Sequence, residues 1–321
     1  MGITVGNALT FEEMFNTARK HQDEGEFVEA EEIYRRLLKV DRDPMAINYY
    51  LGLALLATRR AEEALPHLQT AMRVAEESGA TDRVKNTISL QVANAVFPGT
   101  GYYQIIEKLG AELKPRGYLE IGVNTGVSLA LIKAPAVAIG VDPEPRVAHL
   151  NDNAVVYPLT SDAFFEQGLV ARNHPGFKLD LAFIDGLHAF FQVLRDFINI
   201  EAMAEKNAIV LLHDIYPPTR WSASPTHNGG HWAGDGWKIF FFLHRLRPDL
   251  ELSLIRAHPT GLGVVRHLNP ADTVLREHYG AVVAEAAGMD YSYFETYLPE
   301  IRVVDHIEDV VDFAGWRGWE A

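Results

Sequence analysis

The chain has 321 residues, 48% of them hydrophobic and 22% charged, a composition typical of a globular protein long enough for more than one domain. It contains no cysteine, which excludes disulfides, thiolate metal sites and cysteine nucleophiles and fits a reducing compartment such as the cytoplasm. The formal net charge of −14, with no segregated basic patch, argues against nucleic-acid binding. We also expect no secretory signal and no membrane span, because the chain has no apolar run of the required length.

Two similar helical segments occupy the first part of the chain. Small residues alternate with bulky ones in both, as two crossing helices require. The positions concerned are Ala18, Gly25, Phe27, Ala30, Tyr34 and Leu37 in the first segment, and Leu51, Gly52, Ala64, Leu68 and Ala71 in the second. This pattern resembles the tetratricopeptide repeat, for about two units over residues 11–77. It departs from that repeat at Arg59, which replaces a turn glycine, and at Asn48, which replaces an aromatic residue.

Two such repeats are fewer than the three that normally stand alone. We therefore expect a helix at residues 82–97 to cap them, or the array to rest on the next domain. Two interpretations of this region stay open. It is either a helical extension that supports the fold or forms a homo-oligomer, or a surface that binds a protein or peptide partner.

After residue 117 the pattern changes to apolar runs that alternate with helical stretches. This alternation predicts a parallel sheet with helices on both faces. The expected strands are 118–123, 136–142, 154–159, 179–185 and 208–214, and the expected helices lie around 128–133, 163–172 and 190–205. Two further runs, 250–257 and 262–268, are joined only by HPTG and so predict an antiparallel hairpin.

We therefore expect an α/β fold, a doubly wound and mainly parallel sheet that ends in an antiparallel hairpin, preceded by a small all-α region. The predicted domains are residues 1–97, the helical repeat, and residues 98–321, the sheet domain.

The first expected strand leads into a glycine-rich turn, YLEIGVNTGVSLALI, which contains Glu120, Gly122, Asn124 and Gly126. Glycines allow a ligand to approach the backbone closely, and the acidic residue can hold a charged amine. Asp142 ends the second strand, where a carboxylate can bind both hydroxyls of a ribose. These features do not separate a dinucleotide from other nucleotide-like cofactors, and a glycine-rich turn is also consistent with a simple tight turn.

The strand pattern and this turn resemble the class I S-adenosylmethionine-dependent methyltransferases. That family has an acidic residue before G-x-G-x-G, with Asn124 here at the middle glycine, and it holds the adenine ring at the end of the third strand. The resemblance implies S-adenosylmethionine as cofactor, with contacts from Glu120, Gly122, Asn124, Gly126, Asp142, Ser161, Asp162 and Asp185. Helix capping by Asp142 and Asp162 would explain each residue singly, but not the ordered series.

Asp185 ends the fourth expected strand and Asp214 ends the fifth, and each has a histidine nearby, His188 and His213. Neighbouring strands lie about 4.8 Å apart and ligands bind beyond their carboxyl ends, so we expect both carboxylates to face one point. Two carboxylates with open positions suit a hard divalent ion such as Mg²⁺.

The stretches FIDGLH and LLHD resemble the macrocin- and mycinamicin-type sugar O-methyltransferases. The resemblance implies Asp185 as a metal ligand and catalytic residue, His188 as the general base and Asp214 as a second ligand. This chain departs from the family at His213, which would favour Mn²⁺, Fe²⁺ or Zn²⁺ if it completes the ligand set. Alternatively, His213 points into the core, because adjacent strand residues face opposite sides. We also expect His188 to open the next helix, whose N-terminus would keep its ring neutral.

The aromatic-rich segment 215–235 is too long for a simple connector, and we interpret it as an acceptor-binding lid or, alternatively, as a structural or oligomer-forming loop. The resemblance implies methyl transfer to a hydroxyl of a small-molecule acceptor, a sugar or another polar metabolite. One alternative is a methyltransferase whose peptide or carrier-bound substrate is delivered by the helical repeat. Another is a non-catalytic interaction protein that retains the fold as a scaffold.

Overall fold

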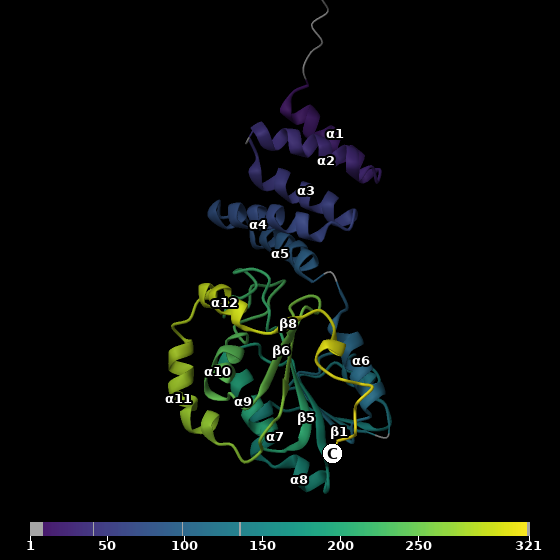
Figure 1. Ribbon diagram of the computed structural model, residues 1–321, viewed down its shortest axis with the longest axis vertical. Coiled ribbons are helices and arrows are strands. Elements are labelled where there is room, and N and C mark those ends of the chain that lie inside the picture. Colours follow the sequence, from purple (N-terminus) through teal and green to yellow (C-terminus); the bar gives the residue numbers. More distant parts are fainter. Residues whose placement is uncertain (1–8, 41, 98, 135, 320–321) are drawn as a thin grey trace, which may run out of the picture. The chain divides into compact units, whose positions relative to one another are not determined.

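The computed structural model describes residues 9–40, 42–97, 99–134 and 136–319. The chain divides into two compact units (Figure 1). The helical unit comprises Met1–Pro98 together with Asn228–His231, and the sheet unit comprises Gly99–His227 together with Trp232–Ala321. Among the described residues, no helix is both long and apolar enough to cross a membrane.

The helical unit is a series of α-helices in which each helix packs against the next along the chain (Figure 1). Its helices are α1 (Phe11–Asp23), α2 (Phe27–Leu37), α3 (Pro44–Ala57), α4 (Ala61–Glu77) and α5 (Asp82–Val96). A short 3-10 turn, Leu38–Val40, follows α2.

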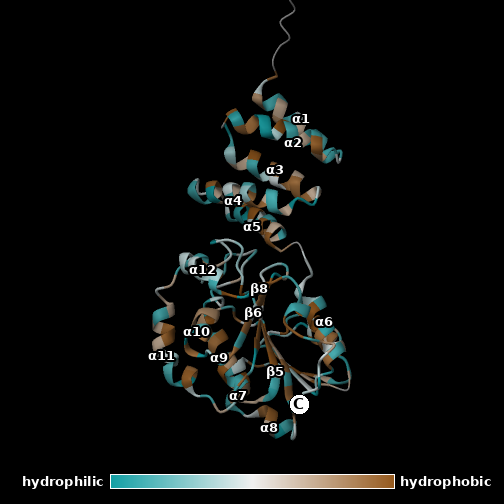
Figure 2. Ribbon diagram, in the orientation of Figure 1, coloured by the Kyte–Doolittle hydropathy of each residue, from teal (hydrophilic) through white to brown (hydrophobic). Residues whose placement is uncertain are grey.

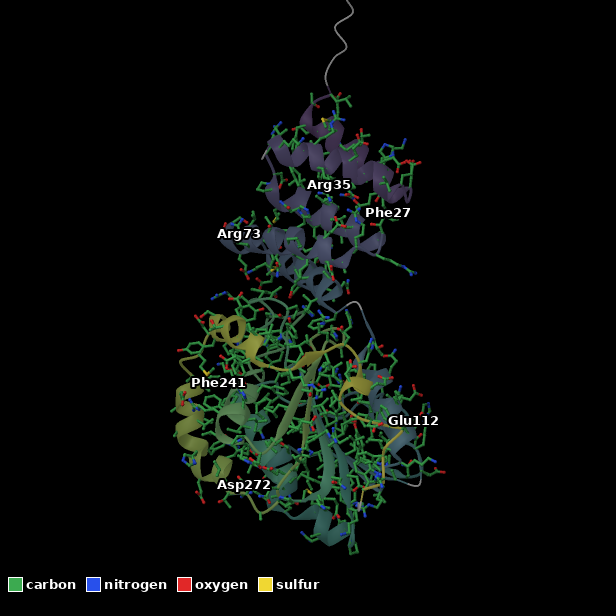
Figure 3. All side chains as sticks on the ribbon, viewed as in Figure 1. Phe27, Arg35, Arg73, Glu112, Phe241 and Asp272 are labelled. Atoms are coloured by element: carbon green, nitrogen blue, oxygen red, sulfur yellow. The ribbon has the colours of Figure 1, made fainter. Side chains whose placement is uncertain are left out.

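Local sequence explains where these helices begin. Thr10 caps α1 in a reciprocal pair with Glu13, which satisfies amide groups that the first turn leaves free. Asp43 caps α3 by accepting a hydrogen bond from the amide of Ala46, and Pro44 follows it at a position where no amide is needed. Arg35 of α2 (Figure 3) pairs with Glu31 one turn earlier, which supports the helix.

The small residues of the repeat pattern lie where the helices pack together. Ala18, Ala30 and Ala64 are completely buried. A Cβ atom at Gly52 would lie 2.6 Å from Leu68, so α3 and α4 can approach this closely only because residue 52 is glycine. The packing agrees with a helical-hairpin array, while its membership in the tetratricopeptide class stays a prediction.

The sheet unit contains an eight-stranded sheet in the order β3-β2-β1-β4-β5-β7-β6-β8. The strands are β1 (Gly117–Ile121), β2 (Val137–Val141), β3 (Ala154–Tyr157), β4 (Leu179–Ile184), β5 (Ala204–His213), β6 (Glu251–Ile255), β7 (Leu262–Arg266) and β8 (Val303–Val304). Strands β1 to β5 pair in parallel, and β7 pairs antiparallel with both β5 and β6. This arrangement confirms the predicted doubly wound sheet with its C-terminal hairpin.

Helices cover both faces of the sheet, and the strands between them are the most hydrophobic segments of the unit (Figure 2). One core includes Phe197 and Phe240, and the other includes Ile106 and Leu109, at opposite faces of the sheet. The helices are α6 (Tyr102–Leu113), α7 (Ser161–Glu166), α8 (Leu169–Asn173), α9 (Phe190–Glu201), α10 (Lys238–Leu246), α11 (Val274–Ala286) and α12 (Tyr291–Tyr297). Short 3-10 turns lie at Leu129–Leu131, Leu298–Glu300 and Ile307–Asp309.

Three expected helices differ from those in the structure. The helix expected around 128–133 is reduced to the 3-10 turn Leu129–Leu131, because the amide side chain of Asn151 binds the carbonyl groups of Ala130 and Ile132 that a longer helix would use. The helix expected at 163–172 is divided by Gly168, whose φ of +58° is left-handed. The helix expected at 190–205 ends at Glu201, and β5 begins three residues later.

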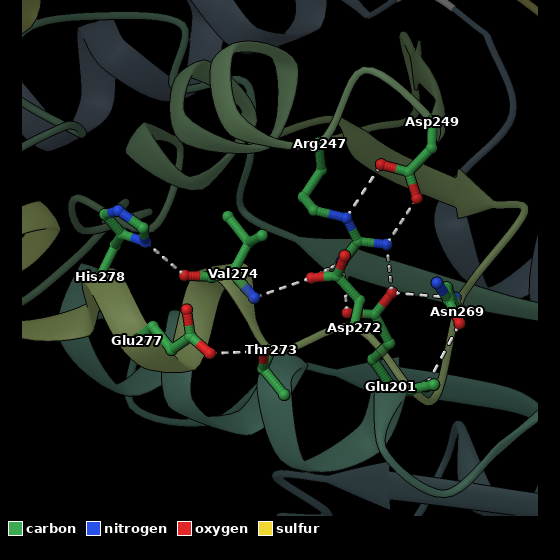
Figure 4. Close-up of polar contacts among 10 residues, drawn as sticks. Glu201, Arg247, Asp249, Asn269, Asp272, Thr273, Val274, Glu277 and His278 are labelled. Carbon is green, nitrogen blue, oxygen red and sulfur yellow. Dashed lines mark hydrogen bonds and ion pairs between the residues drawn. The ribbon is translucent and has the colours of Figure 1, made fainter.

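A buried arginine joins several elements at one end of the sheet (Figure 4). Arg247 follows α10 and is 1% exposed, yet its guanidinium binds Glu201 at the end of α9 at 2.7 and 2.9 Å. It also binds Asp249 before β6 and lies 3.3 Å from Asp272 before α11. Since α9 begins at the carboxyl end of β4 and runs back along the sheet, this cluster lies at the end opposite to the carboxyl ends of the parallel strands.

Candidate functional site

Asp185 and Asp214 lie directly after β4 and β5, which are neighbours in the sheet with Ile184 opposite Leu212. The ring of His213 connects the two carboxylates. Its Nδ1 atom lies 3.0 Å from Oδ1 of Asp185 and 3.1 Å from Oδ2 of Asp214. The structure thus brings both predicted carboxylates to one point at the carboxyl ends of the strands. His213 faces this point, so the alternative in which it points into the core is wrong.

The ring of His188 completes the cluster. Its Nε2 atom lies 3.4 Å from Oδ1 of Asp185, and its Nδ1 atom lies 3.0 Å from Oδ2 of Asp214. His188 and Asp214 both have left-handed backbones, with φ of +57° and +59°. Such conformations are strained for residues other than glycine and persist only where surrounding contacts determine them. The helix α9 begins at Phe190, so His188 precedes the helix and does not open it.

The carboxylates determine the charge on both histidines. Burial lowers the pKa of His188, but the attraction of Asp214 and Asp185 outweighs burial and holds this pKa well above its ordinary value. The expectation of a neutral His188 is therefore wrong, because two carboxylates act on the ring more strongly than the helix terminus does. Burial lowers the pKa of His213 as well, and the same carboxylates raise it to about 10.

The carboxylates respond in the opposite sense. Burial alone would raise the pKa of Asp214, but the attraction of His213 and His188 holds that pKa far below its ordinary range. The pKa of Asp185 is lowered in the same way, chiefly by His213. Each carboxylate of the cluster therefore favours the charged form of the neighbouring imidazoles, and each imidazole favours the charged form of the carboxylates.

Aromatic side chains enclose the cluster. The ring of Tyr102, at the start of α6, lies 4.1 Å from the ring of His213, measured between centroids, and Phe183 of β4 lies 6.1 Å from it. The ring of Trp232 stacks on His188 at 5.1 Å with an angle of 19° between the planes. Trp232 comes from the segment interpreted as a lid. Sequence analysis missed Tyr102, because nothing in its surroundings distinguishes it from any other tyrosine at the start of a helix.

The donor atoms fit a divalent cation. One ligand atom from each of Asp185, His188 and Asp214 can be chosen so that all lie within 4.8 Å of one another. The sequence implied His213 as the nitrogen ligand. Its Nδ1 atom is used by the carboxylates, and its buried Nε2 atom has no hydrogen-bond partner among the described residues.

The predicted cofactor residue Glu120 is completely buried in β1. Its carboxyl group accepts hydrogen bonds from the hydroxyls of Tyr118, at 2.6 Å, and Ser128, at 2.7 Å. Burial raises the pKa of Glu120 to about 8, although both hydroxyl groups act against this rise. Glu120 therefore stabilises the start of the glycine-rich turn from beneath, and its oxygen atoms are already used by neighbouring side chains.

The turn itself has the backbone that the sequence suggested. Gly122, Asn124 and Gly126 have φ of +90°, +45° and +79°, all left-handed. Asn124 can adopt this conformation because asparagine is among the residues that most often have left-handed backbones. A Cβ atom on Gly122 would lie 2.0 Å from the carbonyl oxygen of Asp185, so this glycine is also needed where β1 passes the end of β4.

Asp142 lies beside this turn. Its Oδ2 atom accepts hydrogen bonds from the amides of Val123 and Asn124 at 3.0 and 2.8 Å, and its Oδ1 atom accepts one from Glu144 at 2.7 Å. Asp142 thus fixes the glycine-rich turn to the end of β2.

Ser161 and Asp162 begin α7 after β3, and Thr160 is the residue that caps this helix. The side chain of Gln192 donates to both Ser161 and Asp162 at 3.1 Å, and Arg195 pairs with Asp162 at 2.5 Å. Both partners come from α9, so the third strand's end is linked to the helix that follows His188. The structure gives Asp162 no capping role of its own.

Residues 119–215 match the family model described as a methyltransferase domain. The match runs from β1 to the residue after Asp214 and so includes the glycine-rich turn and the Asp–His cluster. No curated protein matches the chain.

Several solved structures are similar in part. An O-methyltransferase from Bacillus cereus in complex with SAH is 13% identical, with 52% of this chain and 80% of that chain covered and a TM-score of 0.41. The O-methyltransferase TomG from Streptomyces achromogenes, involved in tomaymycin synthesis and in complex with SAM, is 16% identical, with the same coverage and a TM-score of 0.39. Similarity at this level carries no argument about the activity of this chain.

Proposed function

We propose that this chain is an S-adenosylmethionine-dependent methyltransferase that methylates a hydroxyl group of a small polar acceptor. The observation that carries the proposal is that the family match and the candidate site residues fall on the same strands, β1 to β5. These strands match a methyltransferase domain, and their carboxyl ends bear a left-handed glycine-rich turn beside a cluster of Asp185, His188 and Asp214. Ligands of open α/β sheets bind at that edge.

The residues around the turn fit the cofactor. The backbone of Gly122 to Gly126 would face its amino-acid portion, Asp142 its ribose, and Ser161 with Asp162 its adenine ring. We assign Glu120 to support of the turn, because its carboxyl group is buried and bonded to two hydroxyls. When bound, S-adenosylmethionine supplies a methyl group that is already activated by the sulfonium charge.

The Asp–His cluster would act on the acceptor. His188 in its neutral form would accept the proton of the acceptor hydroxyl at Nε2, whose contact with Asp185 is the longer of its two at 3.4 Å, while Asp214 holds Nδ1. Asp185 and Asp214 hold the ring and stabilise the imidazolium that forms. Because they also raise the pKa of His188, a higher pH is needed before the neutral form becomes abundant. Trp232, stacked on the ring, limits the access of water.

We also propose that Asp185 and Asp214 bind a divalent cation. Two carboxylate ligands with open positions suit a hard ion that keeps waters for a hydroxyl to displace. Such an ion would polarise the acceptor hydroxyl and lower its pKa. This leaves His188 for proton transfer and gives His213 the task of orienting the two carboxylates.

Two measurements test the proposal. S-adenosylmethionine binding is measured by calorimetry, and formation of S-adenosylhomocysteine is followed with a panel of sugars, polyols and phenols as acceptors. We expect binding by the wild type and turnover with at least one hydroxyl acceptor. The His188→Ala variant should bind the cofactor normally and turn over roughly 10²–10⁴-fold more slowly, the usual range for loss of a general base. Absence of cofactor binding would overturn the proposal, and undiminished turnover by His188→Ala would remove the base.

A further inference from the structure

His188 has a left-handed backbone, with φ of +57°, immediately before α9. A histidine does not adopt this conformation without contacts that hold it. The contacts come from the segment 234–238, which is distant in sequence. The amides of Asp235 and Gly236 both donate to the carbonyl oxygen of His188, each at 3.1 Å. This carbonyl is therefore fixed by two donors on one side of the residue.

The approach of the segment requires a glycine. A Cβ atom at Gly234, whose own φ is +71°, would lie 2.3 Å from the carbonyl oxygen of His188 and 2.8 Å from its Cβ atom. Any other residue would force the two backbones apart. Trp232, two residues earlier, stacks on the His188 ring. Residues 232–236 thus contact both the backbone and the ring of His188.

The side chain of Asp235 also binds the first turn of α9. Its Oδ1 atom accepts a hydrogen bond from the amide of Phe190, the first residue of α9, at 2.7 Å. The residue at the usual capping position is Ala189, which has no side-chain acceptor, so Asp235 supplies the cap from outside the helix. Its Oδ2 atom pairs at 2.8 Å with Lys238, whose side chain is only 6% exposed. This partner cannot be replaced by solvent.

We propose that Asp235 is a positioning residue for His188. Through its amide, its carboxylate and its pair with Lys238, it fixes the His188 ring between Trp232 and the two carboxylates. The inference rests on the proposed role of His188 as the base. The segment GDGWK, residues 234–238, would therefore support proton transfer indirectly. Its side chains take no proton themselves, and Asp235 acts only by positioning His188.

The test uses the ring protons of His188, observed by NMR in the full chain with labelled histidine and assigned with a His188→Gln variant. Stacked Trp232 displaces these resonances by its ring current, and Trp232→Ala defines their position without it. We expect Asp235→Asn to move the His188 resonances toward that position. The matched control is Asp82→Asn, which removes the exposed carboxylate of an Asp–Lys pair of the same spacing in α5 and should leave the resonances in place. Unmoved resonances in Asp235→Asn would overturn the proposal.

Asp235→Asn leaves the buried Lys238 without its charge partner and so carries a risk to folding. The double variant Asp235→Asn with Lys238→Met removes both charges. Moved His188 resonances in this variant would support the proposal, and unmoved resonances would overturn it. A merely structural role would not predict the kinetic result. We expect turnover to fall by about 10²-fold, as displacement of a catalytic group by about 1 Å can cause, while cofactor affinity stays within twofold. A fall in cofactor affinity with unchanged turnover would count against positioning.

The two proposals fail in different ways. If His188→Ala retains full turnover, His188 is not the base, yet the resonance shift in Asp235→Asn still shows that Asp235 positions its ring. If His188→Ala loses turnover while Asp235→Asn retains both its turnover and its resonances, the base stands and the positioning role of Asp235 is wrong.

Discussion

The Nδ1 atom of His188 lies 3.0 Å from Oδ2 of Asp214, and this contact governs when His188 can accept a proton. The negative charge of Asp214 favours the imidazolium, so its removal should lower the pKa of His188 toward the ordinary value. We predict that Asp214→Asn lowers the pH at which the His188 ring loses its proton. NMR titration of the His188 ring in the presence of chelator measures the shift.

Asp162→Asn is the control for this titration. Asp162 pairs with Arg195 on α9, and none of its contacts among the described residues is with the His188 ring, so its loss should leave the midpoint unchanged. An equal midpoint in Asp214→Asn and the wild type would contradict the electrostatic account.

Metal binding separates the roles of the two residues at the end of β5. We predict that the wild type binds one Mn²⁺, that Asp214→Asn loses this binding, and that His213→Gln keeps it. The reason is that Nδ1 of His213 already lies within 3.1 Å of both carboxylates as their hydrogen-bond donor. Calorimetric titration with Mn²⁺ compares the affinities of the wild type and the two variants. Loss of binding in His213→Gln would return His213 to the ligand set that the sequence implied.

Asp142 links the glycine-rich turn to β2 through the amides of Val123 and Asn124. We predict that Asp142→Ala weakens S-adenosylmethionine binding by about 1.5–3 kcal/mol, as expected for loss of hydrogen bonds to a charged group. Asp152→Ala removes an exposed carboxylate from the following loop and serves as the control. Calorimetry on both variants decides the matter, and equal affinities for Asp142→Ala and the control would remove Asp142 from the cofactor site.

Glu120 should make stability depend on pH. Its pKa in the folded chain, about 8, exceeds the unfolded value near 4.5, so the folded state keeps a proton that the unfolded state has lost between these values. The contribution of Glu120 to the free energy of unfolding therefore decreases as the pH rises from about 5 to 8. Glu120→Gln has no such proton. We predict that its stability relative to the wild type increases over this interval, as measured by denaturant unfolding at each pH without cofactor. A constant difference would show that Glu120 is ionised in the fold.

Arg59 and Gly25 occupy corresponding turns of the helical unit, with φ of +61° and +83°. A left-handed backbone costs a non-glycine residue roughly 1–2 kcal/mol. We predict that Arg59→Gly raises the free energy of unfolding by up to about 1 kcal/mol, after allowance for the greater freedom of glycine in the unfolded chain. The reciprocal variant Gly25→Ala should lower it, although no atom lies within 4 Å of the added methyl group. Thermal unfolding measures both, and changes of the same sign would contradict the explanation.

Sequence pattern predicted the fold well because alternation of apolar strands with helices leaves few sheet topologies. It located Asp185, His188, His213 and Asp214 together for the same reason, since the carboxyl ends of neighbouring parallel strands must meet. It could not locate contacts that depend on loop geometry. Tyr102 reaches His213 from α6, and Asp235 reaches Phe190 across the fold, and neither contact has a periodic signature.

The charge of His188 was predicted wrongly for a related reason. The expectation considered the helix N-terminus, which is local in sequence, whereas the charge depends on Asp214, which comes from another strand. The expected helix at 128–133 failed similarly, because Asn151 takes carbonyl groups that a helix would have used.

Arg247 joins the end of α9 to the segments before β6 and before α11 through one buried guanidinium. The unfolding of each of these elements is therefore coupled to the unfolding of the others. Local fraying of one element would remove a carboxylate partner from the buried guanidinium, so partial opening is costly and the elements should separate together. Amide hydrogen exchange in α9, β6 and α11 is accordingly expected to proceed through a common, large-scale opening. Proteolytic cleavage within these elements would then also require this large-scale opening.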